Sequence, residues 1–216
     1  MSNKKFDSII LDIDGTIWDT TNIVAEGWNN AIDRTFPNVP HVTAEIIKGQ
    51  FGKTMNVIAQ NLFPMLNDEE KNILKHEIHA EEQLMIPKIT EDITFPNVRR
   101  LIPELSKTYK MFIVSNCHNG YIRVTIEKNG LAPYITDWEC HGNTGKSKGE
   151  NIKDVIIRNN LTSPIYVGDT QGDYEACKEA NVPFIWAAYG FGKPEGYFAK
   201  INDFSELQSV LESTNI

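Results

Sequence analysis

The pattern of apolar and polar positions places one strand first, then a long helical stretch, and then an alternation of strands and helices. Residues 9–11 are an apolar, mostly β-branched run of the kind that predicts a buried strand. From there to about residue 86, apolar residues recur at helical spacing. This stretch predicts four helices, which begin at Thr20–Thr21, Thr43, Thr54 and Asn67.

Strands return in the second half of the chain. Apolar runs predict strands at residues 110–114, 164–167 and 183–187, and helical spacing covers residues 98–107, 120–129, 150–159 and 203–212, with a further helix ending at Ala180. Strands that alternate with helices form parallel sheets covered on both faces. We therefore expect an α/β fold: a Rossmann-like doubly wound parallel sheet with an inserted small all-α cap of four helices. The expected core comprises residues 1–16 and 87–216, and the expected cap residues 17–86.

Two acidic residues, Asp12 and Asp14, follow the first predicted strand. Residues i and i+2 of a strand share a face, and ligands of open α/β sheets bind just beyond the carboxyl ends of the strands. Gly15 permits a sharp exit from the strand. Two adjacent carboxylates repel each other, so a metal or phosphate chemistry would explain the pair. A solvated polar strand end is the alternative interpretation.

Polar residues also follow the predicted strand at residues 110–114 and precede a later helix. Ser115 and Asn116 could donate hydrogen bonds to a phosphoryl oxygen, or could simply form a strand-to-helix turn. Lys146 and Lys148 lie just before the helix at residues 150–159. An ammonium group beside Asp12 would keep that carboxylate ionised and offset charge on a phosphoryl group. Lys148 is the better candidate because it is nearer the helix start, although a solvated basic turn is also consistent.

A second acidic pair, Asp169 and Asp173, follows the strand at residues 164–167. If Asp173 lies in the first turn of the next helix, both carboxylates point back toward the strand end. Ligands that are all oxygen suit a hard cation such as Mg²⁺. The alternative is an Asp N-cap followed by an acidic first turn, which the helix dipole favours.

Together these segments resemble the four motifs of the haloacid dehalogenase superfamily of phosphohydrolases. The motifs are Asp12-Ile13-Asp14-Gly15-Thr16, Ser115-Asn116, Lys148, and Gly168-Asp169 with Asp173. The helical insertion resembles the small helical cap of that superfamily, and the layout is similar to that of its phosphoglycolate-phosphatase-like members. In that group the lysine is often followed by proline, whereas Gly149 follows Lys148 here, so Lys146 stays open as the alternative.

The resemblance implies a Mg²⁺-dependent phosphatase that hydrolyses a small-molecule phosphate monoester of the phosphoglycolate or sugar-phosphate class. It implies that Asp12 forms an aspartyl-phosphate and that Asp14 is the general acid and base. Mg²⁺ would bind Asp12, the backbone carbonyl of Asp14, Asp169, and Asp173 directly or through water. The phosphoryl oxygens would be held by Ser115, Asn116 and Lys148, with Thr16 positioning the loop.

Specificity is expected to lie in the cap, where the sequence is less informative. Lys53, on the turn Gln50-Phe51-Gly52-Lys53, could meet a substrate carboxylate or phosphate, or could be an exposed turn residue. His118 could face the pocket or the surface. The main alternative function is a sugar-phosphate mutase similar to β-phosphoglucomutase. Carbon–phosphorus bond cleavage with Lys53 as a Schiff-base residue, and a binding protein on an inactive scaffold, are further alternatives.

The net charge and the cysteine content limit the binding partners and the compartment that we expect. The net charge is -8 and the basic residues are scattered, which argues against nucleic acids and anionic membranes as partners. Three cysteines without a C-x-x-C spacing argue against a disulfide framework or a zinc site and favour a reducing compartment. The polar start of the chain is not a signal peptide, and no apolar run approaches a membrane span. We expect a cytoplasmic monomer or homodimer.

Overall fold

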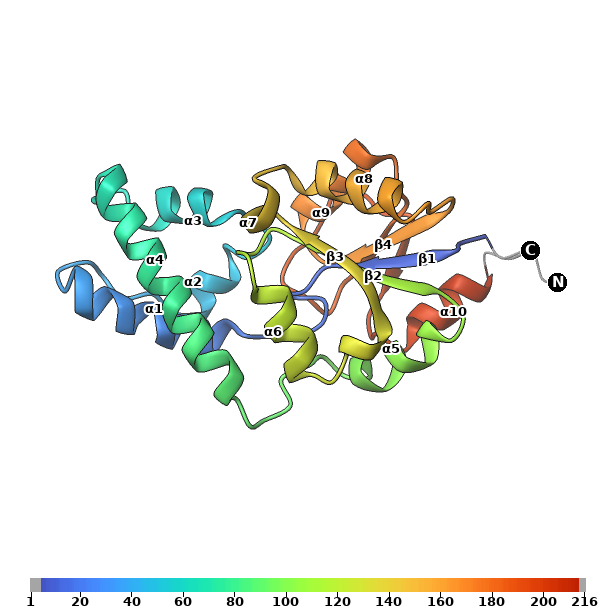
Figure 1. Cartoon of the computed structure of the whole chain (residues 1–216), viewed down its shortest axis with the longest axis horizontal. Helices are drawn as coiled ribbons and strands as arrows, with labels where there is room; N and C mark the ends of the chain where they lie inside the picture. Colours follow the sequence, from blue (N-terminus) through green and yellow to red (C-terminus); the bar gives the residue numbers. More distant parts are fainter. Residues whose placement is uncertain (1–4, 214–216) are drawn as a thin grey trace.

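A parallel β-sheet forms the centre of the computed structural model, which describes residues 5–213 (Figure 1). In this part of the chain the sheet has six strands in the order β3-β2-β1-β4-β5-β6, and each neighbouring pair is parallel. The strands are β1 (Ser8–Leu11), β2 (Lys110–Ser115), β3 (Ile135–Cys140), β4 (Pro164–Gly168), β5 (Phe184–Ala187) and β6 (Ala199–Ile201). The predicted α/β class and parallel sheet are confirmed.

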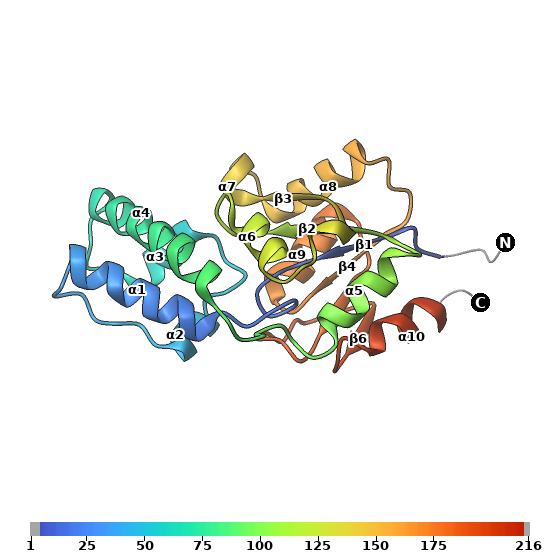
Figure 2. The same ribbon diagram turned by 60° about the horizontal axis from the view of Figure 1, so that its bottom comes forward.

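Helices cover both faces of this sheet (Figure 2). They are α5 (Val98–Ser106), α6 (Tyr121–Lys128), α7 (His141–Thr144), α8 (Lys148–Arg158), α9 (Gln171–Ala180) and α10 (Glu206–Ser213), with 3-10 turns η1 (Ile86–Lys88) and η2 (Ala132–Tyr134). On one face, Ile10 of β1 packs in a cluster with residues of α8 and α9. On the other, Ile9 and Leu11 pack with residues of α5, α6 and α10. Burial on both faces explains why residues 9–11 of β1 are all apolar.

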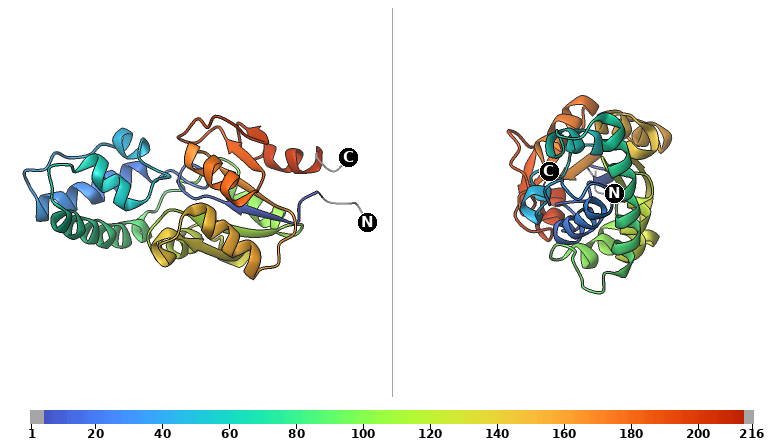
Figure 3. Two further views of the ribbon diagram at one scale, coloured as in Figure 1. Left: turned by 90° about the horizontal axis from the view of Figure 1, so that it is seen from above. Right: turned by 90° about the vertical axis from the view of Figure 1, so that its left-hand side faces the viewer.

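Four further helices form a cap beyond one end of the sheet (Figure 3). They are α1 (Thr21–Thr35), α2 (Ala44–Lys48), α3 (Met55–Leu62) and α4 (Asp68–Met85). Their apolar faces enclose a hydrophobic cluster of their own, which includes Trp28, Phe63 and Ile78. The cap faces the carboxyl ends of the strands, because cap residues share a pocket with Asp12 and Ser115. The predicted all-α insertion is confirmed.

Side chains cap two of the four cap helices at the predicted residues, and Thr54 precedes α3 without a side-chain cap hydrogen bond. The Thr43 hydroxyl accepts a hydrogen bond from the Ile46 backbone N–H at the start of α2, and Asn67 begins α4 as a capping box. Thr20 does not cap α1 as predicted, because its hydroxyl donates to Asp14 instead. The adjacent Asp19 carboxylate accepts from the backbone and hydroxyl of Thr21.

The sequence pattern does not predict strands β3 and β6. β3 is an edge strand whose central residues include Asp137 and Glu139, so it lacks the apolar run that predicts a buried strand. β6 occupies the opposite edge and spans only Ala199–Ile201. Edge strands bury less of their surface, and their apolar pattern is correspondingly weaker.

Candidate active site

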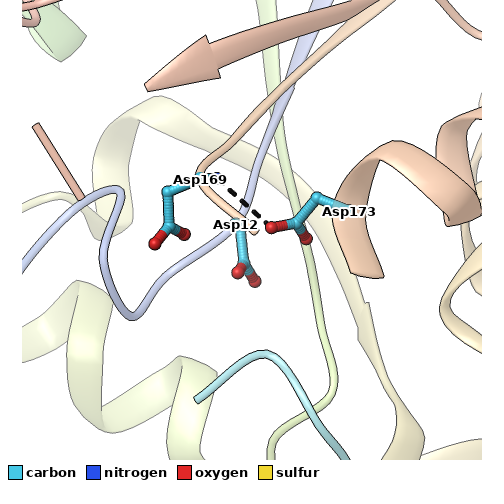
Figure 4. Close-up of side chains that lie close together, drawn as sticks. All are labelled: Asp12, Asp169 and Asp173. Carbon is cyan, nitrogen blue, oxygen red and sulfur yellow. Dashed lines mark hydrogen bonds between the residues drawn. The ribbon is translucent and has the colours of Figure 1, made fainter. Parts of the chain in front are cut away.

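Asp12, Asp169 and Asp173 form a buried acidic cluster at the carboxyl ends of β1 and β4 (Figure 4). One carboxylate oxygen of each residue lies within 4.8 Å of the others. Figure 4 shows Asp12 and Asp169 reaching into the same space from two neighbouring strand ends, with Asp173 on the first turn of α9. The prediction that these two strand ends bring acids together is therefore correct.

Lys148 is the cation of this cluster. Its Nζ lies 3.1 Å from Asp12 Oδ1 and 2.5 Å from Asp173 Oδ1, and its side chain is 3% exposed. Burial alone would lower the pKa of Lys148, but the carboxylates of Asp12 and Asp173 outweigh it and raise this pKa above its usual value. Lys146 points elsewhere, to Asp154 on the surface. The geometry thus selects Lys148 over Lys146.

Capping boxes at the starts of α8 and α9 fix the backbone positions of Lys148 and Asp173. Ser147 and Glu150 form a capping box that starts α8 at Lys148, and Thr170 forms a capping box with Asp173 at the start of α9. Asp173 Oδ2 accepts hydrogen bonds from the backbone N–H and the hydroxyl of Thr170, at 2.9 and 2.6 Å. Asp173 Oδ1 accepts a hydrogen bond from Lys148, so both carboxylate oxygens of Asp173 have partners. Asp173 thus holds the Lys148 ammonium group against the start of α9.

Asp169 is enclosed by backbone. Its Oδ2 accepts a hydrogen bond of 2.7 Å from the Phe191 N–H, and its Oδ1 lies 3.4 Å from the Thr16 hydroxyl. Gly15 has a positive φ of 84°, as its place after the strand predicted, and a Cβ there would collide with the Asp169 carboxylate. A Cβ at Gly190 would collide with the same side chain. Burial first, and then the charges of Asp173 and Asp12, raise the pKa of Asp169 well above its usual value.

Asp12 is a buried carboxylate that lies beside Lys148. Burial raises its pKa to about 6, and the charge of Lys148 and a hydrogen bond with Ser115 oppose that increase. Asp12 is therefore mostly ionised at neutral pH. Its Oδ1 is buried and forms an ion pair with Lys148 Nζ but no hydrogen bond within the described part of the chain.

Asp14 has a separate environment. Its Oδ1 accepts hydrogen bonds from Tyr121 Oη at 2.7 Å, Thr20 Oγ1 at 3.0 Å and Trp18 Nε1 at 3.2 Å. Burial raises the pKa of Asp14 to about 7 although the Tyr121 hydrogen bond lowers it. An acid with this pKa can both donate and accept a proton near neutral pH. The sequence analysis missed all three donors, and Tyr121 is 107 residues away along the chain.

The acidic cluster fits a hard cation. Its three buried carboxylates face one ammonium group, so negative charge is left over in a site with little water. Asp12 Oδ1 also lacks a hydrogen bond. Oxygen donors that carry excess negative charge are the ligands that Mg²⁺ prefers. Asp12 and Asp169 fit best, because among the described residues Asp12 Oδ1 has no hydrogen bond and Asp169 Oδ1 has only the long 3.4 Å contact with Thr16, whereas each oxygen of Asp173 accepts a hydrogen bond of 2.9 Å or shorter.

A pocket between the core and the cap opens onto Asp12 and Asp14. It has about 60 Å³ of open volume, and its core side includes Ser115 and Asn116. The Asn116 side-chain N–H donates to the Gly52 carbonyl at 2.8 Å, so this residue also contacts the cap. Lys53 lies at the pocket but is exposed, and its Nζ donates to Gly49 O and Gln50 Oε1 of its own turn.

Comparison with known proteins identifies the fold and the family. The sequence model of the family described as "Haloacid dehalogenase-like hydrolase" matches residues 9–187. A structure described as a predicted phosphoglycolate phosphatase from Haemophilus somnus superposes with a TM-score of 0.85 at 17% identity, covering 96% of this chain and 99% of that one. A predicted phosphatase from Clostridium acetobutylicum gives 0.81 at 17% identity, with the same two coverages.

A third similar structure is the hydrolase YfnB from Bacillus subtilis, bound to magnesium, with a TM-score of 0.73, 17% identity, and coverage of 97% of this chain and 100% of that one. No curated protein has a significantly similar sequence. At these identities the structural likenesses establish the fold. Within residues 5–213, none of the helices has the length and apolarity needed to cross a membrane.

Proposed function

The chain belongs to the haloacid dehalogenase-like hydrolases, and on that premise we propose that it is a Mg²⁺-dependent phosphatase of small-molecule phosphate monoesters. The observation that carries the proposal is the ionised, buried Asp12 beside Lys148, at the base of a pocket that also contains Asp14. The names of the similar structures from Haemophilus somnus and Clostridium acetobutylicum are consistent with it.

In the first step a carboxylate oxygen of Asp12 attacks the phosphorus atom of the ester. The bond from phosphorus to the leaving oxygen breaks, and Asp14 donates its proton to that oxygen. The product is an aspartyl-phosphate and a free alcohol. A pKa of about 7 leaves a sizeable fraction of Asp14 protonated at neutral pH, as this role requires.

In the second step Asp14, now a carboxylate, accepts a proton from water. The water oxygen attacks phosphorus, and the bond between phosphorus and Asp12 breaks. Inorganic phosphate is released and both aspartates return to their starting states. The three donors on Asp14 Oδ1 hold the carboxyl group in one orientation for both proton transfers.

Three other polar groups are proposed to hold the phosphoryl oxygens. The Lys148 ammonium lies against Asp12, and Ser115 and Asn116 line the same pocket. Positive charge and N–H or O–H donors at this position stabilise the negative charge of the transferring group. Thr16 is proposed to hold the loop after β1 through its contact with Asp169.

Mg²⁺ would be held by Asp12 and Asp169, with the backbone carbonyl of Asp14, and Asp173 as a further ligand directly or through water. Bound there, the cation supplies positive charge that offsets repulsion between the nucleophile and the anionic substrate. The magnesium in the similar Bacillus subtilis structure is consistent with this proposal.

The small volume of the pocket beside Asp12 and Asp14 favours a small substrate. Its open volume of about 60 Å³ is enough for a few water molecules or a small leaving group. No observation favours a mutase over a phosphatase.

The free thiols of Cys117, Cys140 and Cys177 are consistent with a reducing compartment. We propose a cytoplasmic monomer or homodimer without nucleic-acid or membrane partners.

The test is phosphate release from a panel of phosphorylated metabolites with p-nitrophenyl phosphate as a generic substrate. We expect release that requires Mg²⁺, stops with EDTA and is lost in Asp12→Asn. The control is Asp33→Asn, which makes the same change at an exposed cap position and is expected to retain activity. Substantial turnover by folded Asp12→Asn, or no release from any monoester by the wild-type protein, would refute the proposal.

A further inference from the structure

A polar cluster where the cap meets the core, at the wall of the pocket, has no role in the phosphoryl chemistry described above. Glu82 lies on α4, and each of its carboxylate oxygens has a partner. Trp28 Nε1 donates to Oε1 at 2.8 Å, and His118 Nε2 lies 2.8 Å from Oε2. All three residues line the pocket that contains Asp12 and Asp14. The cluster therefore faces the position that a leaving group would occupy.

His118 and Glu82 form an ion pair. The Nδ1 of His118 lies 3.0 Å from the Asn119 carbonyl, and its Nε2 faces the Glu82 carboxylate. Both partners are acceptors, so both ring nitrogens must carry protons and the ring is an imidazolium. The pair has no net charge, and the positive charge of His118 is already directed at Glu82.

His79 completes the cluster with an unused hydrogen-bonding atom. Its ring stacks on that of His118 with centroids 4.3 Å apart, and its Nε2 is buried and has no hydrogen-bond partner among residues 5–213. Burial, with the charge of His118, lowers the pKa of His79 to about 4, so this ring is neutral. A buried polar atom without a partner costs free energy, and a bound ligand is one way to satisfy it.

The charges in the pocket disfavour a second anionic group on the substrate. Among the described lining residues, Lys53 is the cation without a carboxylate partner, and its ammonium donates to its own turn at an exposed position. A carboxylate on the leaving group would instead meet Glu82, Asp14 and a neutral His79. The remaining cap-side wall is apolar and includes Val24, Trp28, Met55 and Ile58.

We propose that His79 and the Glu82–His118 pair form the leaving-group subsite, and that it accepts an uncharged, hydroxyl-bearing alcohol of the polyol or sugar type. A hydroxyl group can both donate and accept, so it can satisfy His79 Nε2 in either tautomer. This inference rests on the proposed phosphatase function and narrows its substrate class, because it disfavours phosphoglycolate.

Three phosphate esters with two-carbon leaving groups test it: 2-hydroxyethyl phosphate, 2-phosphoglycolate and ethyl phosphate. We expect kcat/KM for 2-hydroxyethyl phosphate to exceed that of each of the other two by about tenfold or more, since an unpaired buried polar group and a buried charge both oppose binding. p-Nitrophenyl phosphate reports whether the enzyme is active at all.

Variants assign the preference to individual residues. His79→Leu should remove the preference for 2-hydroxyethyl over ethyl phosphate, and His79→Gln should keep part of it because the amide still hydrogen-bonds. Glu82→Gln should raise the relative kcat/KM for 2-phosphoglycolate, because it removes from the pocket wall a carboxylate that repels the carboxylate of this substrate. His76→Gln and Glu69→Gln, at exposed positions on α4, are the matched controls and should leave these ratios unchanged.

Two results would overturn the inference while the phosphatase proposal survives. One is a preference for 2-phosphoglycolate, and the other is equal turnover of 2-hydroxyethyl and ethyl phosphate. An absence of turnover with every ester, p-nitrophenyl phosphate included, would remove the phosphatase proposal and the subsite with it.

Discussion

Asp173 Oδ1 lies 2.5 Å from Lys148 Nζ, closer than the 3.1 Å that separates this ammonium from Asp12. The other oxygen of Asp173 is bound to the start of α9. Asp173 therefore ties the cation of the site to a rigid helix end. Sequence motifs alone suggest that Asp173 is only a metal ligand. The geometry indicates that Asp173 also positions the Lys148 ammonium group.

This relationship predicts the effect of Asp173→Asn. An amide keeps the size of the side chain but loses its charge, so Lys148 should be less firmly held beside Asp12. We expect kcat to fall by about a hundredfold, as for loss of a preorganised charged donor, with a smaller change in KM. Steady-state kinetics with p-nitrophenyl phosphate measure this.

Thr170→Ala is the control for Asp173→Asn. It removes a cap hydrogen bond to Asp173 Oδ2 but leaves the contact with Lys148. If both variants lose activity equally, the effect is structural and the positioning role of Asp173 is wrong.

Asp14→Asn should separate the two chemical steps. p-Nitrophenolate leaves without help from an acid, so Asp12 can still be phosphorylated, but hydrolysis of the aspartyl-phosphate lacks its base. We expect a burst of nitrophenolate equal to the amount of enzyme, then turnover reduced by about a hundred- to ten-thousandfold. Rapid-mixing absorbance measurements test this. Unchanged turnover of an alkyl phosphate would exclude Asp14 as the general acid.

The His118–Glu82 pair predicts a pH dependence of stability, since it joins the loop after β2 to α4 of the cap. Burial lowers the pKa of His118, but the hydrogen bond and charge of Glu82 outweigh it, so the folded-state pKa lies above the ordinary 6.5. The stabilisation from this pair is complete below about pH 6.5 and is lost as pH rises through the folded-state pKa.

Thermal unfolding of wild type and His118→Gln measures this effect. The wild-type advantage should be greatest near pH 6 and shrink toward pH 9, by about 2–4 °C for each kcal/mol that the pair contributes. His76→Gln, an exposed histidine on α4, should show no such change. An advantage that is constant or grows with pH would show that His118 is neutral in the folded protein.

Much of the site could be predicted because its residues follow local patterns. Asp12 and Asp169 come directly after apolar strands, and parallel strands bring such positions to one edge. The partners of Asp14 could not be predicted in this way. Tyr121 begins α6 and reaches Asp14 only because β1 and β2 pair in parallel, a relationship between segments that lie far apart in the chain.

The polar cluster of His79, Glu82 and His118 could not be predicted from local patterns either. Glu82 and His79 lie on a helix whose buried face is otherwise marked by residues such as Leu74 and Ile78. Charged residues on a helix usually face solvent, so periodicity alone does not place them in a pocket. Their role depends on how the cap sits on the core, and tertiary contacts such as that with His118 decide it.

The excess negative charge of the acidic cluster predicts that Mg²⁺ stabilises the fold. Three buried carboxylates repel one another around a single ammonium group, and a cation bound only in the folded state adds RT ln(1 + [Mg²⁺]/Kd) to the free energy of unfolding. The unfolding temperature should therefore rise with Mg²⁺ concentration and saturate. Differential scanning fluorimetry measures this without any substrate.

The variant Asp169→Asn tests whether Asp169 binds the Mg²⁺ ion in that experiment. The variant should have a higher unfolding temperature than wild type in EDTA, because it removes one of the repelling buried charges, and should respond far less to Mg²⁺. The pKa of Asp169 is raised by burial and by its acidic neighbours, which is why neutralising it relieves strain in the metal-free protein. Asp154→Asn, on the surface beside Lys146, is the control and should respond to Mg²⁺ as wild type does. An equal Mg²⁺ response in Asp169→Asn and wild type would place the cation elsewhere.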